Sequence, residues 1–524
     1  MRGFISAKEA AAMVKDGWSM ALGGFLGMSL PEDIYYELEK SYLETGHPAK
    51  LKLSSVAGLG GDGATRGYNR FSHPGMVGEL RACNLTFCPE MKRLASENDF
   101  PCYMFPQGVQ AHMMRAIAGK KPGVITQIGV KTFADPRVEG CKMNEAAKKA
   151  DKEVVKLLEL DGNEYLYYPS YTFDCALIKG TSADENGNIS IEHESLTVEQ
   201  FEMACAAKNS GGIVIAQVDR VVQAGSLHPR SVIVPGAIVD YVVVGRPENS
   251  RQQYAYEQAY RPEMCGEVKI PMDAIEPAPM NIRKVIARRA AMELKKRDFV
   301  NLGVGIPTTV SAVLNEEGIA NDVSFSIESG ITGGVPTGGL ATGGGINPIC
   351  ILKQPDTFDL YDGGGIDVGC LGAAEFDEDG NVNVSKFGGS VVGPGGFSNI
   401  SQCAKTICFC GSFNVGKGEI EIKDGKLHII KDTEGKKFHK KVEQITWSGE
   451  YCREKGVQKA LFITERAVFE VRKEGVTLTE IAPGVDLQKD ILDHMEFKPI
   501  IADDLKLMDE RIFRDEPMGL QLQE

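Results

Sequence analysis

The feature that most constrains the fold of this chain is that its second half repeats the order of features of its first half. One pair of segments, "AAAMVKDGWSMALGGFLGMSLPEDIYYEL" (10–38) and "ARRAAMELKKRDFVNLGVGIPTTVSAVL" (287–314), reads as a helix, a break with Lys and Asp, a short strand, a glycine turn and, after a proline, a second helix. A second pair, "DCALIKGTSADENGNIS" (174–190) and "DVGCLGAAEFDEDGNVNVS" (367–385), reads as an apolar strand, an acidic loop, a Gly-Asn turn and a strand. A single repeat of a strand–turn–helix pattern can arise by chance in an α/β protein, but two such repeats in the same order predict two homologous halves.

The length and the alternation of elements indicate an α/β protein with more than one core. A chain of 524 residues exceeds a single domain of about 150 residues several times over. Apolar strands such as "GGIVIAQV", "YVVVG" and "VSFSI" alternate with helical patterns, which favours two related, open α/β domains built on parallel sheets. Prolines interrupt the segment 267–284, so we predict a first domain over 1–270, a linker over 271–284 and a second domain over 285–524.

Composition and charge disfavour several classes of protein. The net charge of −14 argues against nucleic acid as the main partner. No window approaches the roughly 18 apolar residues of a membrane span, and the N-terminus lacks a signal peptide's apolar core, so we expect a cytoplasmic protein without a membrane partner. The thirteen cysteines are scattered, often in apolar runs, which suits reduced thiols. No Cys-x-x-Cys pair occurs and the eight histidines lack metal-ligand spacing, so we expect no metal.

One glycine motif suggests a nucleotide site but lacks the context for one. "GLGGDG" (58–63) follows a strand-like stretch and matches Gly-x-Gly-x-x-Gly. A dinucleotide site needs a helix to begin at this motif, so that the helix's first amides hold the pyrophosphate. The sequence continues instead as "ATRGYNRFSHPG", with further glycines and a proline. We therefore expect no nicotinamide or flavin cofactor.

The strongest candidate for chemistry is a carboxylate at the end of a predicted strand. In "SFSIESGITGG" (324–334), apolar and polar residues alternate with the period of a half-buried strand, and Glu328 falls on the polar side at its last position. Ligands of parallel α/β sheets bind beyond the carboxyl ends of the strands. Glycine-rich turns elsewhere in the chain would let backbone N–H groups approach a ligand or an oxyanion. From the residues alone, a solvated or ion-paired glutamate is the simpler interpretation of this pattern.

A series of ordered blocks resembles the family I coenzyme A transferases. The blocks are "NLGVGIP" (301–307), "ESG" (328–330), "DGGGID" (362–367), "GNVNVSKF" (380–387) and "GPGGFSNIS" (393–401). Further blocks, among them "PQGVQAHMMRA" (106–116), "GVITQIGVKTFADPR" (123–137) and "QITWSGEY" (444–451), extend the resemblance over nearly the whole chain. Within this family the chain is most similar to the single-chain propionate and acetate CoA-transferases, in which two halves are fused.

The resemblance implies roles for several residues. In the family, the glutamate of the "ESG" block is acylated and then carries coenzyme A as a thioester, and Glu328 is the residue that matches it. A glutamine after a proline and a backbone amide of the second-half glycine loop stabilise the oxyanion. These groups correspond to Gln107 of "PQG" and to Gly395 or Gly396 of "GPGG", of which we favour Gly396. Contacts to coenzyme A are expected at Gly303, Val304, Gly305 and Gly395.

The activity that the resemblance implies is the transfer of coenzyme A from a short-chain acyl-CoA to a short-chain carboxylate such as propionate, acetate or lactate. The reaction would be ping-pong, through an acyl-glutamyl anhydride and a glutamyl-CoA thioester, with coenzyme A as a substrate and no permanently bound cofactor. A homo-oligomer, either a dimer or a tetramer, is also expected. The alternative is an acyl-CoA thioester hydrolase in which Glu328 acts as a base for water. A non-catalytic subunit of the same fold is disfavoured, because the "ESG", "PQG" and "GPGG" blocks are intact.

Overall fold

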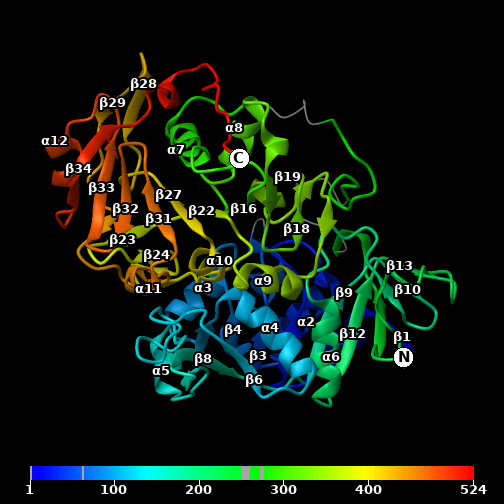
Figure 1. Ribbon diagram of the computed structural model, residues 1–524. Coiled ribbons are helices and arrows are strands. Elements are labelled where there is room, and N and C mark those ends of the chain that lie inside the picture. Colours follow the sequence, from blue (N-terminus) through cyan, green and yellow to red (C-terminus); the bar gives the residue numbers. More distant parts are fainter. Residues whose placement is uncertain (1–2, 62–63, 250–259, 272–276) are drawn as a thin grey trace.

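The computed structural model describes residues 3–61, 64–249, 260–271 and 277–524, so residues 272–276 of the predicted linker lie outside the described residues. Two α/β units lie against each other in Figure 1, the first coloured blue to green and the second green to red. An eight-stranded sheet is built within residues 3–244 and a ten-stranded sheet within residues 299–507. This arrangement confirms the predicted fold class of two related α/β domains, whereas the domain boundaries stay a prediction.

The first sheet is parallel throughout, with the strand order β1-β15-β12-β9-β2-β3-β4-β5. Its central strands are buried on both faces, as expected for a parallel sheet that helices cover on both sides. In sheet order the strands are β1 (Gly3–Ile5), β15 (Tyr241–Val244), β12 (Ile213–Val218), β9 (Cys175–Lys179), β2 (Ser19–Leu22), β3 (Leu51–Ser54), β4 (Val77–Ala82) and β5 (Cys102–Met104).

The second sheet has a parallel centre and antiparallel pairs toward both edges, except that the edge strand β34 pairs in parallel with β33. In sheet order the strands are β21 (Cys350–Ile351), β18 (Ile331–Thr332), β17 (Ser324–Ser326), β16 (Phe299–Leu302), β22 (Val368–Gly372), β27 (Thr406–Cys410), β31 (Lys459–Ile463), β32 (Ala467–Arg472), β33 (Gly475–Ile481) and β34 (Ile500–Leu507). The short strand predicted within the segment 287–314 is β16.

The repeated sequence segments occupy equivalent places in the two sheets. β2 and β16, from the first pair of segments, lie beside β9 and β22 respectively, which come from the second pair. The order β12-β9-β2-β3 of the first sheet therefore corresponds to the order β27-β22-β16-β17 of the second. Because equivalent strands present their carboxyl ends in the same way, each sheet offers the same kind of edge for a ligand.

Helices cover both sheets, and four of them begin near the candidate site: α4, α6, α9 and α10. The α-helices of the described residues are α1 (Ala7–Met13), α2 (Glu32–Thr45), α3 (Pro89–Ser96), α4 (Gln107–Ala118), α5 (Glu145–Lys149), α6 (Gln200–Asn209), α7 (Ile282–Ala291), α8 (Thr309–Glu316), α9 (Gln354–Asp362), α10 (Phe397–Cys403), α11 (Gly449–Lys455) and α12 (Leu487–Asp490). One hydrophobic cluster continues from Met114 on α4 to Phe358 on α9 and Phe397 on α10. The two halves therefore share part of their core.

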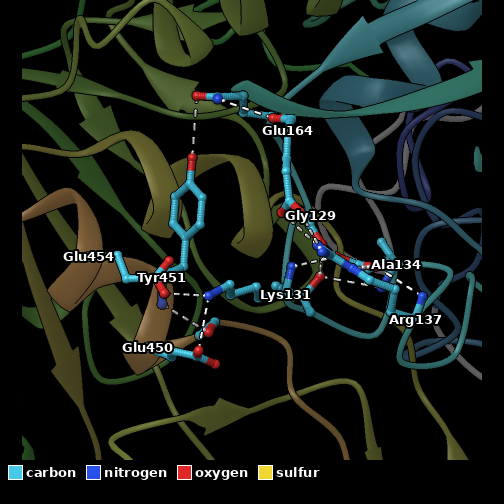
Figure 2. A network of polar contacts seen from close by, with 12 residues as sticks. Gly129, Lys131, Ala134, Arg137, Glu164, Glu450, Tyr451 and Glu454 are labelled. Atoms are coloured by element: carbon cyan, nitrogen blue, oxygen red, sulfur yellow. Dashed lines mark hydrogen bonds and ion pairs between the residues drawn. The ribbon is translucent and has the colours of Figure 1, made fainter. Parts of the chain in front are cut away.

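A polar network joins the two halves away from that shared core (Figure 2). Nζ of Lys131 lies 2.9 Å from Oε1 of Glu450 and 2.5 Å from Oε1 of Glu454, both on α11. Beside this pair of contacts, the backbone N–H of Gly129 donates to Oε1 of Gln402 at 2.9 Å. The contact of Lys131 with Glu450 connects the sequence blocks 123–137 and 444–451, so part of the sequence pattern in those blocks serves to hold the halves in one arrangement.

The strand before Glu328 differs in one respect from its prediction. The apolar set of the alternation is buried, as predicted, but Ser326 on the supposedly polar side is also 0% exposed. Its Oγ lies 2.6 Å from Oη of Tyr361 on α9. Because α9 covers the sheet at this point, the polar position of Ser326 is buried and finds a hydrogen-bond partner, whereas Ser324 at the start of the strand is exposed.

Candidate active site

A single cavity of about 280 Å³ lies at the carboxyl ends of strands from both sheets. Its walls are mainly apolar, and none of the described residues that line it is Lys, Arg or His. The lining residues are Phe25, Leu26, Ala57, Gly58, Asn84, Thr86, Phe87 and Gln107 from the first half, and Gly303, Val304, Glu328, Thr342, Leu371, Gly372, Val384, residues 392–397 and Ile400 from the second.

Glu328 lines the cavity from the tight turn that follows β17. The N–H of Ile327 donates to the carbonyl of Ile331 at 2.9 Å, and the N–H of Gly330 donates to the carbonyl of Ile327 at 3.0 Å. Gly330 has φ +117°, and a Cβ at this position would lie 2.1 Å from the carbonyl oxygen of Leu352. The glycine of the "ESG" block is thus required by the turn that presents Glu328.

The surroundings of Glu328 disfavour its charge. Burial among apolar groups raises the pKa of Glu328 above its usual value near 4.5. The side chain is half-buried, and it borders the cavity. Since no cation lines the described part of the cavity, an ionised Glu328 is weakly stabilised there, which makes it a stronger nucleophile or base than a carboxylate in water.

Gln107 reaches the same cavity from the other half of the chain. It is the first residue of α4, and its backbone N–H donates to the carbonyl of Gly395 at 3.1 Å. Its side-chain Nε2 donates to Oε1 of Gln354 at 2.6 Å. The structure therefore brings together Gln107 and Glu328, which the sequence analysis assigned to one site from separate halves.

The two candidate glycines of the "GPGG" loop differ in what their amides do. The N–H of Gly395 donates to the carbonyl of Cys83 at 2.9 Å. For the N–H of Gly396, no hydrogen-bond partner occurs within the described part of the chain. A Cβ on Gly396 would come within 3.1 Å of Cγ of Glu328. Of the two glycines, Gly396 is therefore the one whose amide has no partner among the described residues, and it lies beside the Glu328 side chain.

Only part of the "GVG" turn after β16 lines the cavity. Gly303 and Val304 line it, and Val304 is 58% exposed. Gly305, which has φ +95°, is not among the lining residues. Gly58 of the "GLGGDG" motif also lines the cavity, a role that the sequence analysis did not assign.

Two polar residues near the site were missed by the sequence analysis. Gln354, the first residue of α9, accepts from Gln107 and donates to Oε2 of Glu199, which directly precedes α6. Their signal in the sequence is weak, because a polar residue at a helix start is ordinary in any α/β protein.

Comparison with known proteins connects this geometry to a family. Residues 4–245 match the family model described as "Coenzyme A transferase". The caffeate CoA-transferase of Acetobacterium woodii is 45% identical over 525 residues, which cover 99% of each chain. The acetate CoA-transferase YdiF of Escherichia coli (strain K12) is 41% identical over 521 residues, which cover 99% of this chain and 97% of that one. The chain belongs to the coenzyme A transferase family.

Solved structures of a relative agree with this membership. The apoenzyme of acyl-CoA transferase YdiF from Escherichia coli O157:H7 has a TM-score of 0.94 and 39% identity, covering 100% of this chain and 98% of that one. Its thioester complex with CoA has a TM-score of 0.93. The family resemblance read from the ordered blocks is confirmed. The protein is a CoA-transferase, an enzyme that moves coenzyme A between an acyl-CoA and a carboxylate.

Two further features of the described residues concern other kinds of site. Among the helices of the described residues, none combines the length and the apolar character needed to cross a membrane. The described residues also hold no group of three or more His, Cys, Asp or Glu side chains placed to bind a metal ion.

Proposed function

We propose that this CoA-transferase moves coenzyme A from a short-chain acyl-CoA, such as propionyl-, acetyl- or lactoyl-CoA, to a short-chain monocarboxylate by a ping-pong mechanism through Glu328. The observation that carries the proposal is that Glu328, Gln107 and Gly396 surround one apolar cavity although they come from both halves of the chain. Relatives named for acetate and caffeate support carboxylate exchange. A thioester complex of a 39% identical acyl-CoA transferase with CoA supports a covalent route.

The exchange proceeds in steps that conserve the energy of the thioester. The Glu328 carboxylate attacks the acyl carbonyl, the C–S bond breaks, and coenzyme A leaves as a thiolate. A thiolate can leave because the pKa of a thiol is about 8.5. The thiolate then attacks the glutamyl carbonyl of the acyl-glutamyl anhydride, releasing the acyl group as a free carboxylate and leaving a thioester on Glu328. An incoming carboxylate reverses both steps.

Each tetrahedral intermediate carries an oxyanion that needs hydrogen-bond donors. We assign this role to Nε2 of Gln107 and to the free N–H of Gly396. Gly303, Val304, Gly305 and Gly395 are assigned to coenzyme A. Loss of one preorganised donor of this kind costs about 3–4 kcal/mol of transition-state stabilisation.

The walls of the cavity favour monocarboxylates with an apolar tail. Phe25, Leu26, Ala57 and Phe87 face the space around Glu328, and none of the described lining residues is a cation. A dicarboxylate such as succinate would bury its second carboxylate without a partner, which is costly in an apolar site. We therefore expect succinate to be a poor acceptor relative to acetate or propionate.

Incubation with acyl-CoA alone tests the covalent mechanism. A transferase should release free acid in at most one equivalent per site and then stop, with coenzyme A attached to Glu328. Borohydride should reduce that thioester and change one peptide that contains Ser326–Gly330. Glu328→Gln should abolish both the adduct and the exchange, because a neutral amide is a far weaker nucleophile of nearly the same shape.

The alternative, a hydrolase that uses Glu328 as a base, predicts a different result in the same experiment. Acid would be released continuously, and no adduct would accumulate. The apolar walls disfavour this outcome, since water must enter for hydrolysis and the cavity offers it few polar contacts. Continuous release without an acceptor carboxylate, or an adduct on another residue, would overturn the proposed function.

We further propose a cytoplasmic homo-oligomer, a dimer or a tetramer, in which each chain has domains over 1–270 and 285–524 joined by a linker over 271–284. Light scattering measures the mass of the assembly directly, and a monomer would contradict the oligomeric proposal. Limited proteolysis tests the linker: cleavage within 271–284 that yields two stable fragments is expected, and first cleavage elsewhere would move the boundary.

A further inference from the structure

A chain of buried hydrogen bonds leads from Gln107 away from the cavity. Nε2 of Gln107 donates to Oε1 of Gln354 at 2.6 Å. Nε2 of Gln354 in turn donates to Oε2 of Glu199 at 2.8 Å. The three residues are 3%, 0% and 0% exposed, respectively. The chain passes from α4 in the first half to α9 in the second and back to the start of α6 in the first.

We propose that Gln354 and Glu199 are positioning residues that determine which end of the Gln107 amide faces the reacting carbonyl. The inference rests on the proposed function, in which Nε2 of Gln107 stabilises the oxyanion. The two ends of an amide have nearly the same shape but opposite polarity. With its nitrogen toward the cavity, Gln107 stabilises an oxyanion; with its oxygen toward the cavity, it repels one.

Glu199 gives the chain its direction. In the structure Nε2 of Gln354 donates to Oε2 of Glu199, and the ionised carboxylate enforces this direction because it can only accept hydrogen bonds. Oε1 of Gln354 then faces Gln107, and Nε2 of Gln107 donates a hydrogen bond to it. One hydrogen of that nitrogen makes the bond to Gln354, and the second is not used by that bond, so in the proposed mechanism it serves an acceptor bound in the cavity that Gln107 lines.

The opposite end of the Gln107 amide is held in a consistent way. Oε1 of Gln107 accepts from Sγ of Cys83 at 3.8 Å. Burial raises the pKa of Cys83, so its sulfur keeps the proton that it donates. The thiol is a weak donor and could not impose this orientation by itself. The bond to Gln354 is therefore the stronger constraint on the amide.

The environment of Glu199 is closed and acidic. Its Oε1 is buried without a hydrogen-bond partner among the described residues. Burial and the neighbouring Glu202 raise the pKa of Glu199, while Lys353 and Arg115 face Glu202, at 3.2 and 3.9 Å. A buried carboxyl with one unused oxygen is costly to retain. Its one bond, to Gln354, supplies a functional reason for its presence.

The first test replaces Gln354 by Met, which has a similar length and no hydrogen-bonding amide. We expect kcat to fall at least tenfold while KM for acyl-CoA stays within about threefold, because Gln107 acts on the transition state. The matched control is Gln110→Met on α4, the helix that begins with Gln107: Gln110 is 0% exposed and donates to Ser54 and Tyr171, but it does not line the cavity. The control should retain kcat within about twofold.

The second test asks whether the effect passes through Gln107. Gln107→Ala should lower kcat by about a hundredfold to a thousandfold. Adding Gln354→Met to Gln107→Ala should lower kcat no further, because no amide remains to be oriented. A merely structural role for Gln354 would instead lower kcat by the same factor in both backgrounds, and that result would overturn the inference.

The third test exchanges the two side-chain types. In Gln354→Glu alone, two carboxyls would meet at the position of a 2.8 Å bond, and kcat should fall. In the double variant Glu199→Gln/Gln354→Glu, the central carboxylate accepts from both neighbouring amides and again forces Nε2 of Gln107 toward it. Recovery of kcat to at least ten times that of Gln354→Glu is expected. If the double variant has the wild-type unfolding temperature but its kcat does not recover, the polarity argument is contradicted.

These outcomes are separable from a failure of the proposed function. Borohydride trapping of coenzyme A on Glu328 should still succeed in the Gln354→Met enzyme, only more slowly. If the wild-type enzyme itself gives no adduct on Glu328, the proposed function fails. If the wild-type adduct forms and Gln354→Met leaves its rate unchanged, only the positioning role fails.

Discussion

Gly396→Ala tests whether Glu328 is held at a fixed distance from the glycine loop. Gly396 has φ −75° and ψ −6°, a conformation that any residue adopts, so the substitution does not strain the backbone and it keeps the N–H. The added Cβ would lie 3.1 Å from Cγ and 3.4 Å from Cβ of Glu328. Ordinary contacts begin at 3.4 Å, so the Glu328 side chain must give by a few tenths of an ångström.

The expected cost is in rate and not in stability. A displacement of 1 Å near reacting groups costs about a hundredfold, so a shift of a few tenths should slow adduct formation by about threefold to tenfold. The free energy of unfolding should change by less than about 1 kcal/mol, because alanine fits the backbone conformation and also restricts the unfolded chain. Single-turnover formation of the glutamyl-CoA adduct and urea unfolding measure the two quantities.

Gly395→Ala is the matched control with the opposite expected profile. A Cβ on Gly395 would find its nearest atoms at 3.9 Å, but φ is +57°, where a side chain strains the backbone. The free energy of unfolding should therefore fall by about 1–2 kcal/mol. At saturating acyl-CoA, adduct formation should slow less than it does in Gly396→Ala. If Gly396→Ala forms the adduct at the wild-type rate, Glu328 is not confined as the geometry requires.

Three further predictions follow from buried charges. Burial raises the pKa of Glu328, and in the proposed mechanism its ionised form is the nucleophile, so kcat/KM for acyl-CoA should fall with decreasing pH, with its break above 4.5. The folded state then binds that proton more tightly than the unfolded state, so the ionised Glu328 destabilises the fold at pH 7. Glu328→Gln should therefore raise Tm at pH 7, and the difference in Tm from the wild type should disappear in acid. Thermal scans at both pH values measure this difference. Arg289→Met should lower the free energy of unfolding in urea by about 3–5 kcal/mol, since Arg289 and Glu480 form an ion pair with side chains only 9% and 8% exposed; a loss below about 1 kcal/mol would contradict this.

The topology was predictable because the repeat carries long-range information. One segment at the start of each half predicted a strand that is β2 or β16, and one later segment in each half predicted an apolar strand that is β9 or β22. That β9 and β22 lie beside β2 and β16 is a finding of the structure. The alternation of apolar and polar residues predicted burial less reliably, because it assumes that one face of each strand is exposed to solvent. Ser326 shows the limit: its position in the pattern is polar, yet α9 covers it.

The residues that orient the site were not predictable, because tertiary packing alone brings them together. Gln107 and Gln354 are 247 positions apart in the chain, and Gln354 and Glu199 are 155 apart. No period or spacing connects them. The choice between Gly395 and Gly396 was likewise open in the sequence, since both are glycines of one loop. It depends on whether each amide already has a partner, which only the folded backbone determines.

The contacts between the halves at the cavity indicate a site that is organised before substrate binds. The N–H of Leu85 donates to the carbonyl of Val392 at 2.8 Å, and the N–H of Gly395 donates to that of Cys83 at 2.9 Å. A Cβ on Gly393 would lie 2.3 Å from the carbonyl oxygen of Cys83, so the two backbones are in direct contact. Opening the halves here would leave buried backbone groups unpaired, at about 1–3 kcal/mol each. These contacts hold Gln107 and the glycine loop in one arrangement, so in the proposed mechanism the binding energy of coenzyme A would be available to reach the anhydride and its oxyanions and would not be needed to close the halves at this point.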